Sequence, residues 1–152
     1  MTPAAARAEA GITIQAPRER VWALLTDFPG MHRWFVGVRA VELDGPPKVG
    51  VERRVTFRGG LAHHETISEW TPPSHLALVV EKPSGLVAAG TRVDIDVAGS
   101  RDEARINWQI RFRLNLGRLP ALLVRPVIQP IVGAALKMSL SRLRRLAESS
   151  RP

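Results

Sequence analysis

The sequence contains no cysteine and no tyrosine. The absence of cysteine excludes disulfide bonds, thiol nucleophiles and cysteine-ligated metals. Tyrosine is a common polar group in pockets for oxygen-rich ligands, so its absence favours plain ligand binding over an enzymatic pocket. The chain also lacks a Gly-rich phosphate loop and a serine-centred nucleophile elbow, the motifs of nucleotide-binding proteins and of many hydrolases.

Long uninterrupted apolar runs are missing as well. The opening MTPAAARAEA has no apolar core segment, so it is no signal peptide, and we expect residues 1–10 to be a disordered lead-in. The most apolar region, residues 119–140, is broken by Arg125, Gln129 and Lys137 and by the internal prolines Pro126 and Pro130. A membrane span needs about 20 nearly uninterrupted apolar residues. We therefore expect no integral membrane association and a cytoplasmic location in a bacterial-type cell.

The net charge of +8 lies partly in the C-terminal region. Glu148 is the one acidic residue there, beside four arginines: Arg142, Arg144, Arg145 and Arg151. Such a balance increases non-specific attraction to nucleic acid and acidic lipid. Nucleic-acid surfaces interleave basic with aromatic residues, and this sequence does not. We interpret the charge as a solvated surface and expect no nucleic-acid partner.

The length of 152 residues and the hydrophobic share of 45% suit one soluble domain. A chain of this size buries roughly 70% of its unfolded surface, which is enough for one sizeable core. No linker or repeat divides the chain, so we expect a single domain over residues 11–148 and a tail over residues 149–152.

Turn residues separate short segments of strand character. A helix is expected to open at Ala16-Pro17 and to stop at Pro29-Gly30, and a second short helix covers residues 31–36. Residues 104–113 show the clearest period of two, so one face of that strand is predicted to be buried: Ile106, Trp108, Ile110 and Phe112. The predicted strands are 11–15, 37–43, 51–57, 61–70, 75–81, 91–97 and 104–113.

The final third of the chain has an apolar stripe of helical period. Pro126 and Pro130 each remove a backbone hydrogen bond and clash one turn back, so they cannot both lie inside an unbent helix. We expect a helical start near Pro120 and an uninterrupted helix over residues 130–148.

Three features together are similar to a known superfamily. They are the opening ITIQAPRERVWALLTDFPGMHRWFVGV, the later ETISEWTPPSHLAL, and the long final amphipathic helix. The chain resembles the SRPBCC superfamily, the START-like and polyketide cyclase/dehydrase-like group. The matching residues are Ala16, Pro17, Val21, Trp22, Asp27 and Trp34.

The resemblance implies an α+β helix-grip fold, in which a curved seven-stranded antiparallel sheet packs on a long C-terminal helix, with two short helices near the N-terminus. The superfamily includes aromatase/cyclases, lipid carriers, hormone receptors and chaperone activators. No catalytic motif of the family lies on identifiable positions here, so no catalytic residue is carried over.

The residues themselves also predict a cavity. One helix cannot fill the concave face of a strongly curved sheet, so space remains for a mostly apolar pocket of roughly 300–1,000 Å³. Trp34 follows a helix break and suits a gate over the mouth of this pocket, although packing of the short helix on the sheet explains it equally well. The predicted ligand-binding residues are Trp34, Phe35, Arg53, Phe57, His63, Glu65, Ile67, Leu78, Ile95, Trp108, Val127 and Ile131.

Three polar residues are predicted to share the inner face. If Ile67 faces the core, then His63 and Glu65 face it too, and Arg53 is in phase with its apolar neighbours. These three are the candidate catalytic residues, because a histidine beside a glutamate can transfer protons near neutral pH. A structural salt bridge at the sheet edge explains them as well. A bulge between Glu65 and Trp70 would place His64 and Ser68 inside instead.

A metal site is not expected, because adjacent His63 and His64 point to opposite faces of a strand and cannot hold one ion together. His32 and His75 have no ligand spacing. No cofactor is expected either.

Three functions remain open. The first is a carrier or sequestering protein for a small hydrophobic ligand, and the second is a polyketide cyclase or dehydratase-like enzyme that uses the same cavity. The third is contact with a protein or membrane surface through the basic C-terminal helix. The oligomeric state, a homodimer included, stays open.

Overall fold

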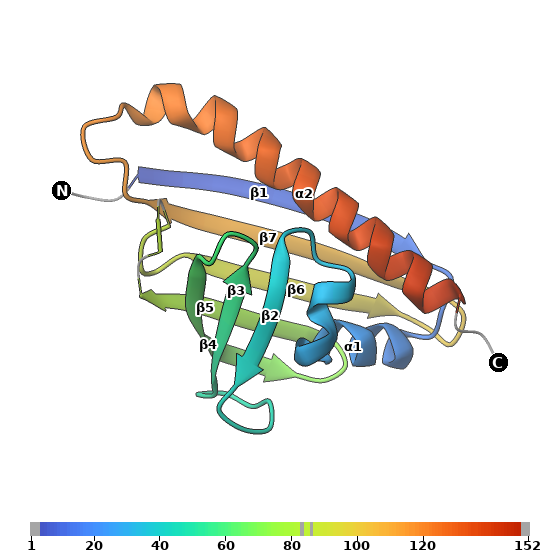
Figure 1. Ribbon diagram of the computed structural model, residues 1–152. Coiled ribbons are helices and arrows are strands. Elements are labelled where there is room, and N and C mark those ends of the chain that lie inside the picture. Colours follow the sequence, from blue (N-terminus) through green and yellow to red (C-terminus); the bar gives the residue numbers. More distant parts are fainter. Residues whose placement is uncertain (1–3, 83, 86, 150–152) are drawn as a thin grey trace.

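The computed structural model describes residues 4–82, 84, 85 and 87–149. Its seven strands form one antiparallel sheet in the order β1-β7-β6-β5-β4-β3-β2 (Figure 1). The predicted seven-stranded antiparallel sheet is therefore confirmed, with boundaries close to the turn residues. The strands are β1 Ala4–Ile14, β2 Val38–Leu43, β3 Glu52–Phe57, β4 Ala62–Thr71, β5 His75–Lys82, β6 Arg92–Gly99 and β7 Ala104–Leu114.

Strand β1 begins well before the sequence predicts. Residues 4–10 pair with β7, from Ala4 opposite Leu114 to Ala10 opposite Trp108, so the expected disordered lead-in is wrong for this segment. The physical reason is a period of two in small residues, with Ala6, Ala8 and Ala10 buried and Arg7 and Glu9 exposed. Residues 1–3 lie outside the described part of the chain.

Two short helices follow β1 as expected. Helix α1 covers Arg18–Thr26 with Pro17 at its N-cap, and it buries Val21, Trp22 and Leu25 against the core. The second helix is a 3-10 helix, η1, over Phe28–Arg33, which starts three residues earlier than the prediction. Both helices lie at one end of the sheet (Figure 1).

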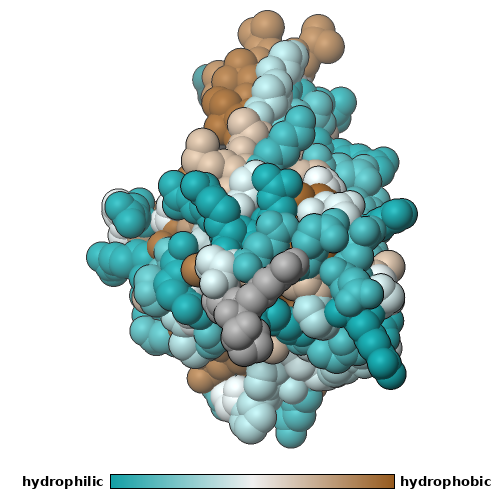
Figure 2. Space-filling view, turned by 90° about the vertical axis from the view of Figure 1, so that its right-hand side faces the viewer, coloured by the Kyte–Doolittle hydropathy of each residue, from teal (hydrophilic) through white to brown (hydrophobic). Residues whose placement is uncertain are grey.

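The C-terminal helix α2 is longer than predicted. It runs from Ala121 to Ser149 with Pro126 and Pro130 inside it, so the expected helical start near Pro120 is confirmed, whereas the expected interruption before residue 130 is wrong. The proline-containing half lies largely in water, as Leu122 at 84% exposed shows, and water can bond the carbonyl groups that the prolines leave unpaired. Hydrophobic surface gathers at this end of the molecule (Figure 2). Residues 150–152 of the predicted tail lie outside the described residues.

Helix α2 crosses one face of the sheet beside its β1 edge (Figure 1). The buried alanines of β1 have side chains short enough for the helix to approach closely. Gln129 Oε1 accepts a hydrogen bond of 2.9 Å from the backbone N–H of Arg7, which protects this edge strand. Further down the helix, Ser139 Oγ accepts a 2.9 Å bond from Val36 N.

The C-terminal half of α2 is a core helix. By length and composition alone, residues Leu122–Ser149 could cross a membrane. However, Leu136, Leu140 and Leu143 are at most 1% exposed and pack in the same hydrophobic core as the sheet. The predicted inner face of β7 is buried in that core as well, and Arg105 and Arg111 are exposed, which confirms the phase.

Candidate functional site

A cavity of about 290 Å³ lies between α2 and the sheet, close to the lower end of the range for small-molecule sites, roughly 300–1,000 Å³. Its position follows from the helix, which lies close to β1 and leaves space over β3 to β6. Most of the wall is aliphatic or aromatic. The wall residues are Met31, Phe35, Val36, Val38, Arg53, Val55, Phe57, His63, Glu65, Val80, Val87, Thr91, Val93, Trp108, Ile110, Phe112, Ile131, Val132, Ala135 and Leu136.

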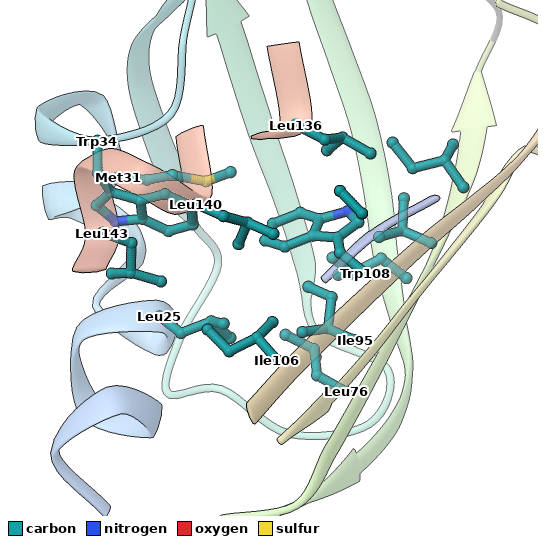
Figure 3. Close-up of a cluster of buried hydrophobic side chains, with 14 of the residues drawn as sticks. Leu25, Met31, Trp34, Leu76, Ile95, Ile106, Trp108, Leu136, Leu140 and Leu143 are labelled. Atoms are coloured by element: carbon teal, nitrogen blue, oxygen red, sulfur yellow. The ribbon is translucent and has the colours of Figure 1, made fainter. Parts of the chain in front are cut away.

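The ring of Trp108 closes the inner end of the cavity. Along β7 the cavity wall comprises Phe112, Ile110 and Trp108. The residues of β7 that precede Trp108 do not line the cavity. Beyond Trp108 the sheet carries a fully buried cluster that includes Ile95 and Leu76, which Figure 3 shows on the opposite side of Trp108 from Leu136.

Three predicted wall residues belong to that core rather than to the cavity: Ile67, Leu78 and Ile95 are at most 1% exposed and do not line the cavity. The expectation that they line it is wrong. The alternation along each strand identifies correctly which residues face inward. It does not show which of these inward-facing residues pack in the core at one end of the sheet and which line the cavity.

The helix side of the cavity also differs from the expectation. Ile131 lines the wall, whereas Val127, one turn earlier, points to solvent at 57% exposed. Trp34 is not a gate, because it is 1% exposed and packs edge-on against Phe35 and Trp108, with ring centroids 5.8 and 6.0 Å away. Packing of the short helix on the sheet is thus its role, and Phe35 is the residue that reaches the wall.

The predicted polar residues Arg53, His63 and Glu65 all lie on the cavity wall. Arg53 of β3 stands directly opposite Glu65 of β4 in the ladder, so their side chains meet on the inner face. Arg53 Nη2 and Nε lie 2.8 and 2.9 Å from Glu65 Oε2, and the two side chains are only 4% and 7% exposed. This is a buried ion pair.

Two further contacts hold the guanidinium of Arg53. Its Cζ lies 4.9 Å from the centroid of the Phe28 ring, a cation–π distance. Its Nη1 contacts Met31 Sδ at 3.8 Å. A guanidinium has more N–H groups than Glu65 and Met31 engage, so donors remain for a molecule in the cavity.

His63 lies beside this pair on β4. Its ring packs against the ring of Phe57, with centroids 4.8 Å apart. Burial lowers the pKa of His63; the Glu65 carboxylate opposes this shift and the Arg53 guanidinium adds to it. The imidazole is therefore neutral near pH 7 and offers one donor and one acceptor.

Two irregularities in the pairing of β4 with β5 leave the predicted phase of His63 and Glu65 intact. At the first shift, His64 pairs with Lys82 and Glu65 with Val80, so the extra residue lies on β5. At the second shift, Ile67 pairs with Leu78 and Glu69 with Ala77, so the extra residue lies on β4. The second shift lets Ile67 and Trp70 both face inward, as the packing of Trp70 on Trp22 shows. His63 and Glu65 precede it and keep the expected phase.

Trp108 contributes a polar atom that the sequence does not reveal. Its indole Nε1 is buried, and within the described residues it has no hydrogen-bond partner. A buried donor without an acceptor is costly, so an acceptor atom of a bound molecule beside this ring would stabilise it. By contrast, Thr91 Oγ1 on the wall is satisfied: it donates to Ala88 O at 3.0 Å and accepts from Arg113 N at 2.9 Å.

A second titratable cluster lies on the outer face of the sheet, away from the cavity. His75 bonds Asp96 at 2.7 Å and also bonds Glu69. Burial disfavours the charged imidazole, but these two carboxylates outweigh burial and raise the pKa of His75.

Potential metal-ligand atoms of Glu69, His75 and Asp94 lie within 4.8 Å of one another, a grouping that the sequence analysis missed. Arg92 bonds both oxygens of Asp94 at 3.0 Å, so the cluster is an ion network that connects β4, β5 and β6.

Residues 5–148 match the sequence model of the family described as polyketide cyclase / dehydrase and lipid transport. The chain belongs to this family. The suspected SRPBCC-type family is thereby confirmed, and the match includes most of the N-terminal part of β1, which the sequence did not predict, and α2 up to Glu148. No curated protein sequence matches the chain significantly.

Solved structures with this family's fold superpose over almost the whole chain. A START superfamily protein from Mycobacterium smegmatis has 9% identity and a TM-score of 0.77, covering 95% of this chain and 99% of its own. The Zhui aromatase/cyclase from Streptomyces sp. R1128 has 17% identity and a TM-score of 0.77, with coverages of 95% and 94%. TTHA0849 from Thermus thermophilus has 16% identity and a TM-score of 0.79, with coverages of 96% and 99%. These similarities confirm the helix-grip fold.

Proposed function

We propose that this family member binds a small, mostly apolar molecule that carries an uncharged hydrogen-bond acceptor, such as a ketone or phenol oxygen. The observation that carries the proposal is the combination of an apolar cavity with unused donors on its wall. Those donors are the N–H groups of Arg53 in excess of the ones that Glu65 and Met31 engage, and the indole N–H of Trp108, which has no partner among the described residues. Burial of the apolar part supplies affinity, and the acceptor satisfies the donors.

An uncharged acceptor suits the cavity better than a carboxylate. Glu65 already neutralises Arg53 at 2.8 Å, so a ligand carboxylate would have no cation left to pair with. It would also lie near the negative charge of Glu65, at a position without bulk water. The sequence alone leaves both ligand types open, because it does not show that the pair forms.

Calorimetry with three naphthalene probes of similar shape tests this proposal. The probes are 2-acetylnaphthalene, 2-isopropylnaphthalene and 2-naphthoate. The expected order of affinity is acetyl, then isopropyl, then naphthoate, with about tenfold between the first two for one good hydrogen bond. Equal affinity for all three, or tightest binding of naphthoate, would contradict the proposal.

The chain offers a matched pair of cavity variants. Val80 lines the cavity, and its neighbour Val79 on β5 points to the outer face. Val80→Phe adds volume inside the cavity and should abolish binding of 2-acetylnaphthalene, whereas Val79→Phe should bind it like the wild type. If both variants bind the probe equally, the binding site lies elsewhere.

Proton transfer is the second candidate function, favoured by a neutral imidazole on the wall beside a buried cation. His63 would remove a proton from the carbon next to a ketone, and Arg53 would stabilise the enolate oxygen that forms. One of the structural neighbours is named as an aromatase/cyclase. In D₂O, wild-type protein should then accelerate deuterium incorporation into the methyl group of 2-acetylnaphthalene, and His63→Gln should remove this acceleration while probe binding persists. No acceleration over buffer by the wild type would leave plain binding as the function.

A further inference from the structure

The exposed half of α2 presents an apolar surface that the fold does not use. Leu122 and Leu123 are 84% and 68% exposed, and Val127 and Ile131 follow Leu123 at four-residue intervals on the same helix face. Soluble monomers rarely expose large contiguous apolar patches without a partner. We name this surface the α2 apolar patch; its members are Leu119, Leu122, Leu123, Val127 and Ile131.

Two exposed arginines lie within or directly beside the sequence span of the patch. Every charged residue between positions 104 and 147 is an arginine or a lysine. Arg118 precedes the helix and Arg125 lies in its second turn, and both are exposed. No carboxylate of this segment neutralises them, so the partner of the patch must accept leucine side chains and positive charge together.

We propose that the α2 apolar patch docks on a membrane surface that contains anionic lipid. A helix of this kind lies in the plane of the interface with its apolar side chains among the acyl chains, while arginines pair with lipid phosphates. A second copy of the chain fits the patch less well, because a symmetric contact would bring Arg118 and Arg125 of one copy close to those of the other. The basic segment near the C-terminus is not the docking site, because the helix there is packed in the core through Leu140 and Leu143.

The docking surface meets the wall of the cavity at Ile131. Ile131 is 63% exposed as part of the patch and also lines the cavity wall, where Val132 follows it. A molecule that leaves the bilayer at this point enters the cavity without crossing bulk water. This step rests on the proposed function of the cavity, whereas docking itself depends only on the surface.

Vesicle sedimentation with the full chain tests docking. Phosphatidylcholine vesicles are compared with vesicles in which about one third of the lipid is phosphatidylglycerol, at about 0.1 M and about 0.5 M salt. The wild type should bind the anionic vesicles at least tenfold more tightly than the neutral ones, and the higher salt should weaken this binding. Leu122→Ser/Leu123→Ser and Arg118→Gln/Arg125→Gln should each lower the partition coefficient at least tenfold.

Control variants use exposed residues of the same kind elsewhere. Val49→Ser/Met138→Ser removes two exposed apolar side chains outside the patch, and Arg144→Gln/Arg145→Gln removes two exposed charges from the other end of α2. Both controls should bind like the wild type. The proposal is overturned if the wild type ignores anionic vesicles, or if the controls lose as much binding as the patch variants.

Two further measurements separate the remaining outcomes. A wild-type dimer that Leu122→Ser/Leu123→Ser dissociates, without any vesicle binding, would assign the patch to self-association and overturn the proposal. Titration of the same variant with 2-acetylnaphthalene reports on the cavity alone and should match the wild type. If the wild type binds vesicles but not this probe, docking stands and only the proposed cavity function fails.

Discussion

Replacing the buried Arg53–Glu65 pair by apolar residues is expected to leave the fold nearly as stable as before. At 2.8 Å and an effective dielectric constant of about 20, the two charges attract each other by roughly 6 kcal/mol. Removing both ions from water costs several kcal/mol each, which offsets most of this attraction. Arg53→Met alone or Glu65→Leu alone leaves one buried charge without its partner and should cost about 3–5 kcal/mol. The double variant should lie within about 1 kcal/mol of the wild type, or be more stable.

Reversible urea unfolding, followed by tryptophan fluorescence near neutral pH, measures these differences. The exposed pair Arg7–Glu9 is the control, with Nη2 and Oε2 3.1 Å apart and side chains 63% and 43% exposed. Alanine at either of its positions should change stability by at most about 1 kcal/mol. Single changes at Arg53 and Glu65 that are equally mild, and that simply add in the double variant, would show that water reaches the pair and would refute the burial argument.

Other predictions concern packing, pH and the helix. Trp108→Ala should cost about 3–5 kcal/mol in the same unfolding assay through the cavity it enlarges, and a cost below about 1 kcal/mol would mean that this ring does not pack as described. The folded-state pKa of His75 is raised. The stability that His75 contributes is therefore complete below about pH 6.5 and is lost as the pH rises through the folded-state pKa. His75→Gln should consequently lower the free energy of unfolding more at acidic than at alkaline pH. The folded-state pKa of His63 is lowered, so the stability that the neutral imidazole contributes is present above about pH 6.5 and is lost on acidification. His63→Gln should therefore reduce the loss of unfolding free energy at acidic pH. Unfolding curves recorded from about pH 5 to about pH 8.5 measure both histidine effects. Pro126→Ala restores an N–H that can bond the carbonyl of Leu122, so hydrogen exchange in the exposed half of α2 should slow, and unchanged exchange would contradict this.

Most of the sheet can be predicted from the sequence, because turn residues mark its strand ends and apolar alternation marks its inner face. The segment 104–113 shows this most clearly, since β7 spans Ala104–Leu114 with the predicted face buried. The N-terminal part of strand β1 was missed because small alanines give little hydrophobic contrast, although Ala6, Ala8 and Ala10 alternate with Arg7 and Glu9. The span of α2 was mispredicted because Pro126 and Pro130 are tolerated where the helix lies in water.

The site is predictable only in part. Phase places Arg53, His63 and Glu65 on the inner face, and ladder pairing then joins Arg53 to Glu65. Whether these residues bind a ligand stays a prediction. The depth of the core and the position of α2 over the sheet depend on contacts between distant segments, which a local pattern does not encode. For this reason Ile95 was expected on the wall, and Leu136, which does line it, was not.

The small side chains of β1 have a consequence for how ligand preference can diverge among proteins of this architecture. They set the separation between α2 and one edge of the sheet, and this separation fixes the tilt of the helix over the other strands. Valine or leucine at position 8 would displace the helix outward at that edge and change the volume enclosed on the far side, because packed elements shift when a buried side chain grows. The size of molecule admitted can therefore change through substitutions on a strand that contributes no atom to the binding surface.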